Sequence, residues 1–397
     1  MRRREAAITT LLLVLSGCSP AAPARLTPSP APSIQIANFE HYVGAYRTAG
    51  GVTYIVNGSG HLLNLNDSTF RQLYTTAVPD RFTTGRAFEV PSPKEADVAF
   101  RMAGVRADQL TIKPVSGSTV VAARLLFKET DVQVPAAGAV LAATVTEPLM
   151  PGPHPGIVIV HGSEPGTRIL YGVWVGFYAS LGLTVVAYDK RGNGASTGTY
   201  PGEFASDGNL ATFAADATAV LRMLASWPGV DPKRVGFYGG SQGGWTVPLA
   251  MGRNQAPASF AILVSGPAVS VDQQQTWADF SASSQLQPGA SPEAMDAAVR
   301  ATTSSGYVPA TVLATIRQPM LWANGANDRQ VPTTVNAEIL RSLHHSNWDI
   351  EILPGVDHGL FENASGLEPD QKKATKLASG LWDLVAGWLA RTVGVAP

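Results

Sequence analysis

The stretch Val235-Gly236-Phe237-Tyr238-Gly239-Gly240-Ser241-Gln242-Gly243 decides the fold of this 397-residue chain. An apolar run typical of a buried strand leads directly into G-x-S-x-G, and a helix-like sequence follows. This strand–turn–helix order favours a functional serine over a plain glycine-rich turn, because the sharp turn lifts the hydroxyl above the edge of a sheet. We therefore expect strained backbone at Ser241 and clashes for any side chain at position 239 or 243.

Apolar, β-branched runs separated by helical patterns lie on both sides of this stretch. Residues 213–224, for example, repeat apolar side chains along one helical face. Such alternation predicts a parallel sheet covered by helices on both faces, and the uneven helices argue against a βα barrel. The predicted fold class is α/β: a doubly wound, mostly parallel sheet of eight strands, the first two partly antiparallel. The expected strands are 120–127, 139–146, 157–160, 183–188, 235–238, 260–264, 320–323 and 348–353.

The segment 266–318 interrupts this alternation. It is rich in Gln, Ala and Ser and is longer than a connection between strands needs to be. We expect helices near 273–284 and 292–303 that form a helical cap over the active site. Its apolar side chains suggest a pocket for small to medium apolar acyl groups, and they are Trp277, Phe280, Leu286, Met295 and Val299.

A base must activate Ser241, since a serine hydroxyl is a poor nucleophile until its proton is taken. Among the seven histidines, His358 follows the eighth expected strand in the loop Pro354-Gly355-Val356-Asp357-His358-Gly359. The chain order serine, acid, histidine suits a G-x-S-x-G nucleophile. We predict His358 as the general base; the alternative is an ordinary solvated loop histidine.

The acid is expected in the loop after the seventh strand. Asp328 lies there, at the carboxyl end of the run 320–323. In that place a carboxylate would fix the tautomer of His358 and stabilise its imidazolium form. Asp357 adjoins the histidine but is expected to point away from it, and Asp328 as a plain loop residue is the remaining alternative.

Acyl transfer also needs two N–H donors for the oxyanion. We expect the backbone amide of Gln242 to supply one and the backbone amide of Ser163 the other. Ser163 ends His161-Gly162-Ser163, directly after the third expected strand. We expect its hydroxyl to be an ordinary loop group and His161 to hold the loop through hydrogen bonds.

From about Leu141 to the C-terminus the chain resembles bacterial α/β-hydrolases of the esterase and serine-peptidase-like group. The resemblance rests on His161-Gly162-Ser163, on the run from Tyr188 to Gly198 with its D-K-R-G-x-G-x-S-x-G pattern, on Gly239–Gly243, and on the loops around Asp328 and His358. It implies a triad of Ser241, Asp328 and His358, with Asp189 and Arg191 as a pair that braces its loop. Gly240 departs from the pattern, since many relatives have His there.

An antiparallel β module precedes this region. Between residues 36 and 114, short strands alternate with turn signals such as Asn57-Gly58 and Asn66-Asp67. The module weakly resembles small β units appended to some bacterial serine hydrolases. The predicted domains are a small β domain at 36–117 and the hydrolase domain at 118–397.

The N-terminus is expected to direct export. Arg2, Arg3 and Arg4 precede the apolar run 8–15, which suits a signal peptide and is too short to span a bilayer. Leu15-Ser16-Gly17-Cys18 resembles the lipobox of bacterial lipoproteins, which implies a lipid on Cys18; an ordinary secretory signal is the alternative. The predictions are a signal peptide at 1–18, a Pro- and Ala-rich tether at 19–35, and a lipid-anchored protein of the bacterial cell envelope.

Composition excludes several classes of site and partner. The formal net charge of −1 and the lack of basic runs beyond the first residues give no footprint for nucleic acid. With a single cysteine and scattered histidines, no metal site is expected. No phosphate-binding glycine loop occurs, so no cofactor is expected either.

These observations predict a serine hydrolase that cleaves carboxylic esters through an acyl-enzyme. A serine peptidase or amidase of the same fold, acting on short peptides, is one alternative. A catalytically idle envelope binding lipoprotein is the other. The oligomeric state does not follow from the sequence.

Overall fold

A computed structural model describes residues 39–281 and 291–395. Cys18, the signal peptide and the tether predicted before residue 36 lie outside the described residues, as does Leu286 in the predicted cap. No helix in the described part of the chain is both long and apolar enough to cross a membrane.

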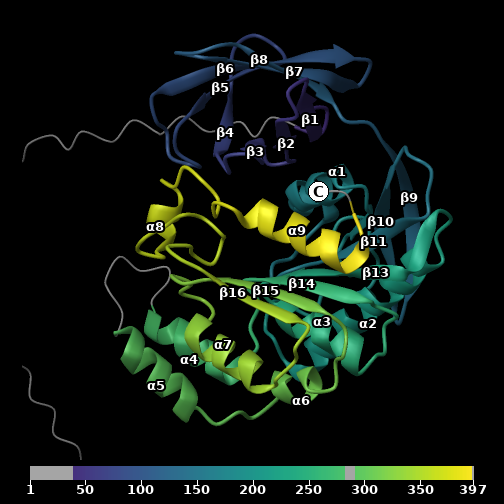
Figure 1. Cartoon of the computed structure of the whole chain (residues 1–397), viewed down its shortest axis with the longest axis vertical. Helices are drawn as coiled ribbons and strands as arrows, with labels where there is room; N and C mark the ends of the chain where they lie inside the picture. The colour runs from purple at the N-terminus through teal and green to yellow at the C-terminus, as the bar shows by residue number, and fades with distance from the viewer. Residues whose placement is uncertain (1–38, 282–290, 396–397) are drawn as a thin grey trace, which may run out of the picture. The chain divides into compact units, whose positions relative to one another are not determined.

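The predicted α/β sheet of eight strands is confirmed, in the order β16-β15-β14-β13-β11-β12-β10-β9 (Figure 1). Each neighbouring pair in the order β16-β15-β14-β13-β11-β12 is parallel. Strand β10 is antiparallel to both of its neighbours, β9 and β12. The strands are β9 (Phe127–Ala136), β10 (Ala139–Pro148), β11 (His154–Val160), β12 (Thr184–Tyr188), β13 (Val230–Gly240), β14 (Phe260–Val264), β15 (Met320–Gly325) and β16 (Trp348–Leu353).

The first sheet strand differs from the sequence prediction. Residues 120–127 do not pair with 139–146; instead β9 pairs with β10 along its whole length. Gly138, with φ 72°, allows the tight turn between them. The sequence concealed β9 because it is an edge strand, so most of its side chains are polar or exposed and no apolar run marks it.

Helices cover both faces of the sheet, and each face has its own apolar core. In β11, Val158 and Val160 point into one core, whereas Ile157 and Ile159 point into the other, as the alternation of a strand requires. Helices α2, α3 and α7 lie on the first face, and α1 and α9 lie on the second (Figure 1). The helices are η1 (Arg168–Tyr171), α1 (Gly172–Ser180), α2 (Asp207–Ala225), α3 (Gly243–Gly252), α7 (Thr333–Ser342), α8 (Glu368–Gln371) and α9 (Leu381–Val393).

The N-terminal β domain is a closed antiparallel barrel of eight strands. Its closure through β1 and β8 was not predicted, and β8 carries the barrel past the domain boundary predicted at residue 117. The strands are β1 (Gly44–Thr48), β2 (Thr53–Val56), β3 (His61–Asn64), β4 (Phe70–Thr75), β5 (Arg81–Gly85), β6 (Lys94–Ala103), β7 (Arg106–Pro114) and β8 (Val120–Arg124).

The described residues of the insertion between β14 and β15 form three helices, which are α4 (Val271–Ser281), α5 (Pro292–Ala301) and α6 (Pro309–Leu313). The first two match the predicted cap helices closely. Trp277, Met295 and Val299 are buried in a small cluster with Val269 and Val335, so the insertion shares a small apolar core with α7.

Candidate active site

Ser241 lies on a sharp turn between β13 and α3. Its φ of 50° is in the left-handed region, which is costly for a residue with a Cβ, and its N–H donates to the Val264 carbonyl at 3.1 Å. The strain expected at this position from the sequence is therefore present. The turn sets the hydroxyl at the carboxyl end of β13 and at the start of a buried helix.

Close packing around the turn requires glycine at two positions. Only one of them, Gly239, is among the two positions expected from the sequence. A Cβ on Gly239 would approach Leu263 and Val247 to 2.8 and 2.9 Å, so that position excludes a side chain. At Gly243 the nearest atoms would lie at 3.5 Å, which is ordinary contact, and the clash expected there is wrong. The close approach is at Gly244 instead, where a Cβ would lie 2.6 Å from the Gly266 backbone because α3 and the loop after β14 touch.

The structure brings Ser241, His358 and Asp328 together. His358 Nε2 lies 3.1 Å from Ser241 Oγ, and His358 Nδ1 lies 2.8 Å from Asp328 Oδ2. The other carboxylate oxygen of Asp328 accepts the N–H groups of Gln330 and Val331 at 2.7 and 2.8 Å. The acid is thus buried and fixed in orientation, and it can hold one ring tautomer with Nε2 facing the serine.

Asp357, the other acid considered, lies elsewhere. Its side chain is buried, and its two oxygens accept the Phe361 N–H and the Asn363 amide, each at 2.9 Å. These bonds fold the loop that carries His358. Burial raises the pKa of Asp357 above its ordinary value.

Two opposed effects act on the pKa of His358. Burial, the largest single influence, lowers it because the charged ring loses water, but the carboxylates of Asp328, Asp357 and Glu164, led by Asp328, together favour the charged ring more strongly. The pKa of His358 therefore ends above its ordinary value. A base with a raised pKa binds the serine proton more firmly and can pass it on later.

The loop that holds Ser163 is oriented by its carbonyl groups. Lys190 Nζ donates to the carbonyls of Gly162 and Glu164 at 2.6 and 2.9 Å, and the Tyr200 hydroxyl donates to that of Ser163 at 2.6 Å. In a trans peptide the N–H points opposite to the preceding C=O, so the Ser163 N–H points away from Lys190.

Two backbone donors remain for an oxyanion. Among residues 39–281 and 291–395, the N–H groups of Ser163 and Gln242 donate to no other protein group. Both residues line the same cavity as Ser241. The Gly162 N–H, by contrast, is already bound to the Tyr171 hydroxyl at 2.7 Å. The two predicted donors thus lie at one cavity, and neither donates to a described protein acceptor.

His161 is fully buried, and its Nε2 lies 2.5 Å from the Tyr188 carbonyl. Burial lowers its pKa to about 4, so the ring is neutral and structural, as expected from the sequence. Asp189 and Arg191 are also structural, but they do not pair with each other. Arg191 forms a buried two-point ion pair with Asp216 on α2, and Asp189 accepts the N–H groups of Arg168 and Ala195.

A cavity of about 340 Å³ opens on Ser241 and His358. The insertion contributes Val271, Gln274 and Gln275 to it, so the predicted role of the cap in shaping the pocket has a structural basis. Of the apolar side chains from which an acyl preference was drawn, the four in the described residues do not line it. Three are in the small core shared with α7, and Phe280 is exposed, so that inference loses their support.

A second cavity, of about 390 Å³, is also lined by His358. Phe88 and Glu89 of the β domain line it, together with Arg329, Gln371 and Lys372 among others. In the described part of the chain no three acidic, His or Cys side chains gather closely enough to hold a metal ion.

Sequence reasoning missed the residues that orient the Ser163 loop. Lys190 belongs to the Asp189-Lys190-Arg191-Gly192 run that was noted as a motif, but its partners are backbone groups that no pattern reveals. Tyr171 was missed as well, and its hydroxyl links the Gly162 N–H to the Glu164 carboxylate.

Comparison with known proteins assigns this chain to a family. Residues 173–376, slightly more than half of the chain, match the model of the prolyl oligopeptidase family. Among similar solved structures is an esterase of Pyrococcus furiosus, with 17% identity and a TM-score of 0.48, over 68% of this chain and 92% of the esterase. Est1E of Butyrivibrio proteoclasticus, solved with ferulic acid bound, has 18% identity and a TM-score of 0.45, over 66% and 99%. None of the curated proteins matches the sequence.

Proposed function

Since the chain belongs to the prolyl oligopeptidase family and is a serine hydrolase with the α/β-hydrolase fold, we propose that it cleaves carboxylic esters through an acyl-enzyme intermediate. The observation that carries the proposal is the continuous contact from Asp328 through His358 to Ser241, at 2.8 and 3.1 Å. That contact gives a hydroxyl a base and gives the base a fixed orientation.

In the proposed reaction the Ser241 oxygen attacks the ester carbonyl carbon while its proton passes to His358 Nε2. The resulting oxyanion accepts the N–H groups of Gln242 and Ser163. When the carbonyl C–O bond breaks, His358 returns the proton to the leaving alcohol. A water molecule, deprotonated by His358, then attacks the acyl carbon, and the carboxylic acid leaves Ser241 free.

We assign the two cavities beside His358 to the two halves of the substrate. The cavity that contains Ser241, Ser163 and Gln242 would receive the acyl group. The leaving alcohol must be next to His358 Nε2, from which it takes a proton, and the second cavity lies on that residue. Its charged lining, which includes Glu89, Arg329 and Lys372, favours a polar leaving group.

A peptidase or amidase activity is the main alternative, because the family is described by a peptidase activity. Ester hydrolysis is favoured by the domain that accompanies the triad. That domain is a small barrel, whereas peptidase relatives of this fold usually have a propeller or another large added domain. An idle binding lipoprotein is disfavoured, because nothing in binding alone requires a strained serine in contact with a buried His–Asp pair.

The test compares p-nitrophenyl esters of increasing acyl length with the p-nitroanilides of the same acids, using the wild type and Ser241→Ala. The proposal predicts ester turnover with a burst of p-nitrophenol, a much lower anilide rate, and loss of both in Ser241→Ala. Efficient anilide cleavage would move the assignment to a peptidase. A folded protein that turns over neither class would contradict the hydrolase proposal.

We also propose that the protein is exported to the cell envelope and anchored by a lipid on Cys18. The support is the sequence alone, through the basic start, the apolar run and Leu15-Ser16-Gly17-Cys18. Incorporation of labelled palmitate by cells that express the wild type, and not by cells that express Cys18→Ser, is the expected result. Equal labelling of both proteins would contradict the anchor.

A further inference from the structure

The interior of the β domain can be followed residue by residue from its strand register. Cross-strand partners share a face of a sheet. The partners Tyr54 and Asn64, Leu62 and Arg71, Thr84 and Ala96, and Ile112 and Val120 therefore face the same side. Leu73 pairs with Thr84, and Val98 pairs with Ile112, and both belong to the barrel's apolar core. All ten residues thus face the barrel interior.

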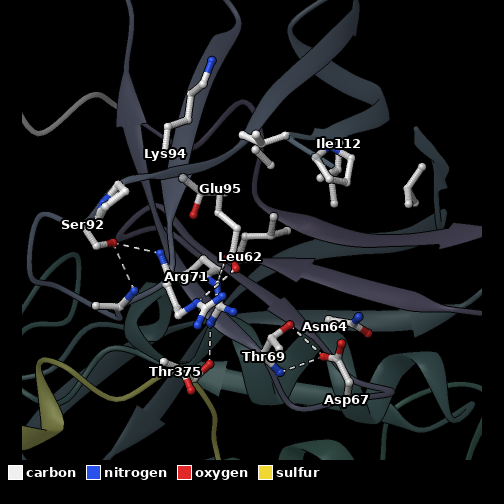
Figure 2. Close-up of a pocket in the computed structure, with 18 of the residues that line it drawn as sticks. Leu62, Asn64, Asp67, Thr69, Arg71, Ser92, Lys94, Glu95, Ile112 and Thr375 are labelled. Atoms are coloured by element: carbon white, nitrogen blue, oxygen red, sulfur yellow. Dashed lines mark hydrogen bonds and ion pairs between the residues drawn. The ribbon is translucent and has the colours of Figure 1, made fainter. Parts of the chain in front are cut away.

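Only one half of that interior is filled. Buried apolar residues, including Val56, Leu73, Phe82, Val98 and Leu110, pack the half on one side. The other half encloses a cavity of about 880 Å³, lined by all four cross-strand pairs named above (Figure 2). Barrels of eight strands have room for packed side chains or for one small ligand, and this barrel is divided between the two.

The cavity is lined by both apolar and polar side chains, and its charges are mostly cationic. Leu62, Ala96, Ile112 and Val120 provide apolar surface. Four cationic side chains stand against two carboxylates in the lining, and they are Arg71, Arg86, Lys94 and Lys373 against Asp67 and Glu95.

Arg71 is the charge best placed to meet a ligand, and it lies beside Leu62 and Glu95 in the lining (Figure 2). Its side chain is 13% exposed and is held by Glu95 at 3.0 Å and by the Thr375 carbonyl at 2.5 Å. Glu95 is shared with Arg86 at 3.5 Å, so one carboxylate faces two guanidinium groups. Lys94 and Lys373 are paired with Asp97 and Asp370 at 3.1 and 3.0 Å, so the excess positive charge of the lining lies at Arg71 and Arg86, which share Glu95.

We propose that this barrel cavity is a binding site for a small organic carboxylate with an apolar body. The apolar body would lie against Leu62, Ile112 and Val120, and the carboxylate would meet the excess positive charge around Arg71. The volume of about 880 Å³ is within the range of roughly 300–1,000 Å³ typical of small-molecule pockets. The site is formed mainly by the barrel, with Lys373 and Thr375 at its edge, and it shares no lining residue with the cavities at His358, so it does not depend on the proposed ester hydrolysis.

The test measures binding of 1-anilinonaphthalene-8-sulfonate, an anionic apolar fluorophore, to the full-length protein, followed by displacement with octanoate, octanol or octylammonium. The proposal predicts that octanoate displaces the dye at least tenfold more effectively than the other two. Equal displacement by octanol, or stronger displacement by octylammonium, would overturn the assignment of a carboxylate.

Neighbouring residues of β8 give a matched pair of variants. Val120 faces the cavity, whereas Val121 is 48% exposed on the outside of the barrel. Val120→Trp should place a large ring in the cavity at its apolar side and reduce dye and octanoate binding at least tenfold, while Val121→Trp should bind as the wild type does. Thermal unfolding of both variants shows whether the barrel remains folded. Undiminished octanoate binding by folded Val120→Trp would overturn the proposed site.

A second pair of variants separates charge from shape. Arg86→Gln with Lys94→Gln removes two cations from the cavity without touching its apolar wall. We expect octanoate binding to fall severalfold and octanol binding to be unchanged. The control, Arg81→Gln with Lys113→Gln, removes two exposed cations of the same barrel that do not line the cavity. Equal losses in the two double variants would show that general charge, and not this cavity, attracts the anion.

Discussion

Replacing Lys190 by Met would test whether the loop at Ser163 is held in place for catalysis. Lys190 is 3% exposed and donates to two loop carbonyls, those of Gly162 and Glu164, at 2.6 and 2.9 Å. Methionine keeps an unbranched apolar side chain of similar length but has no ammonium group. The variant therefore removes both hydrogen bonds and leaves the surrounding packing nearly unchanged.

Opposed effects keep the expected loss of stability moderate. Hydrogen bonds from a charged donor contribute about 1.5–3 kcal/mol each, so two of them contribute about 3–6 kcal/mol. Burial lowers the pKa of Lys190 from 10.5 to about 8, and that change corresponds to about 3 kcal/mol spent on burying the charge. Met has no such charge, so the net loss of unfolding free energy should be about 0–3 kcal/mol.

Catalysis should suffer more than stability. Removing one oxyanion donor costs roughly 10²–10³ in kcat, and a displacement of about 1 Å at a reacting group can cost about 10²-fold. We expect kcat of Lys190→Met on p-nitrophenyl acetate to fall about 100-fold with KM changed little. Lys113→Met, at an exposed lysine of the barrel, is the control and should have wild-type kinetics. A folded Lys190→Met with kcat within threefold of the wild type would refute the positioning role.

Three further outcomes follow from the site. Asp328→Asn should lower kcat by about 10⁴, since the base loses its orienting carboxylate, whereas Asp357→Asn should change steady-state kinetics far less; similar losses would contradict the assignment. In the wild type, kcat/KM should fall as pH drops through the raised pKa of His358, with its midpoint above pH 6.5, because the base must be neutral; a midpoint below that value would contradict the pKa direction. Gly244→Ala should lower the unfolding free energy by about 2 kcal/mol or more in thermal denaturation, while Gly243→Ala should have a smaller effect; the reverse order would contradict the packing.

Much of the site could be predicted because its residues follow the ends of recognisable strands. Ser241 and Asp328 come directly after apolar runs, and His358 comes shortly after another. The carboxyl ends of parallel strands meet at one edge of a sheet, so three separate loops had to converge there. Local sequence was sufficient for that conclusion, although the catalytic roles stay predictions until they are measured.

The features that escaped prediction depend on long-range pairing or on backbone partners. Closure of the barrel joins Tyr46 to Arg124, and no local pattern announces such a pair. The edge strand β9 is polar enough to resemble a loop. The bonds of Lys190 end on carbonyl groups, which every residue carries, so the sequence cannot show which of them it would meet.

The pocket lining is a third feature of this kind. The cap's apolar residues, Trp277 and Met295 among them, could line a substrate cavity or pack against one another, and composition does not distinguish the two. The structure has them packed together and against α7, because helices that leave the sheet must still bury their apolar faces. The side chains that do line the cavity are polar and apolar in similar numbers, such as Gln274 and Gln275 beside Val271.

The central claim is that Ser241 is a nucleophile activated by His358. Its most direct test is the reaction of the folded protein with a fluorophosphonate probe, followed by mass spectrometry of the labelled peptides. The account predicts a single phosphonylated residue, Ser241, with labelling that vanishes in Ser241→Ala and slows at least 100-fold in His358→Ala. Label on another residue, or labelling at an unchanged rate in His358→Ala, would contradict it.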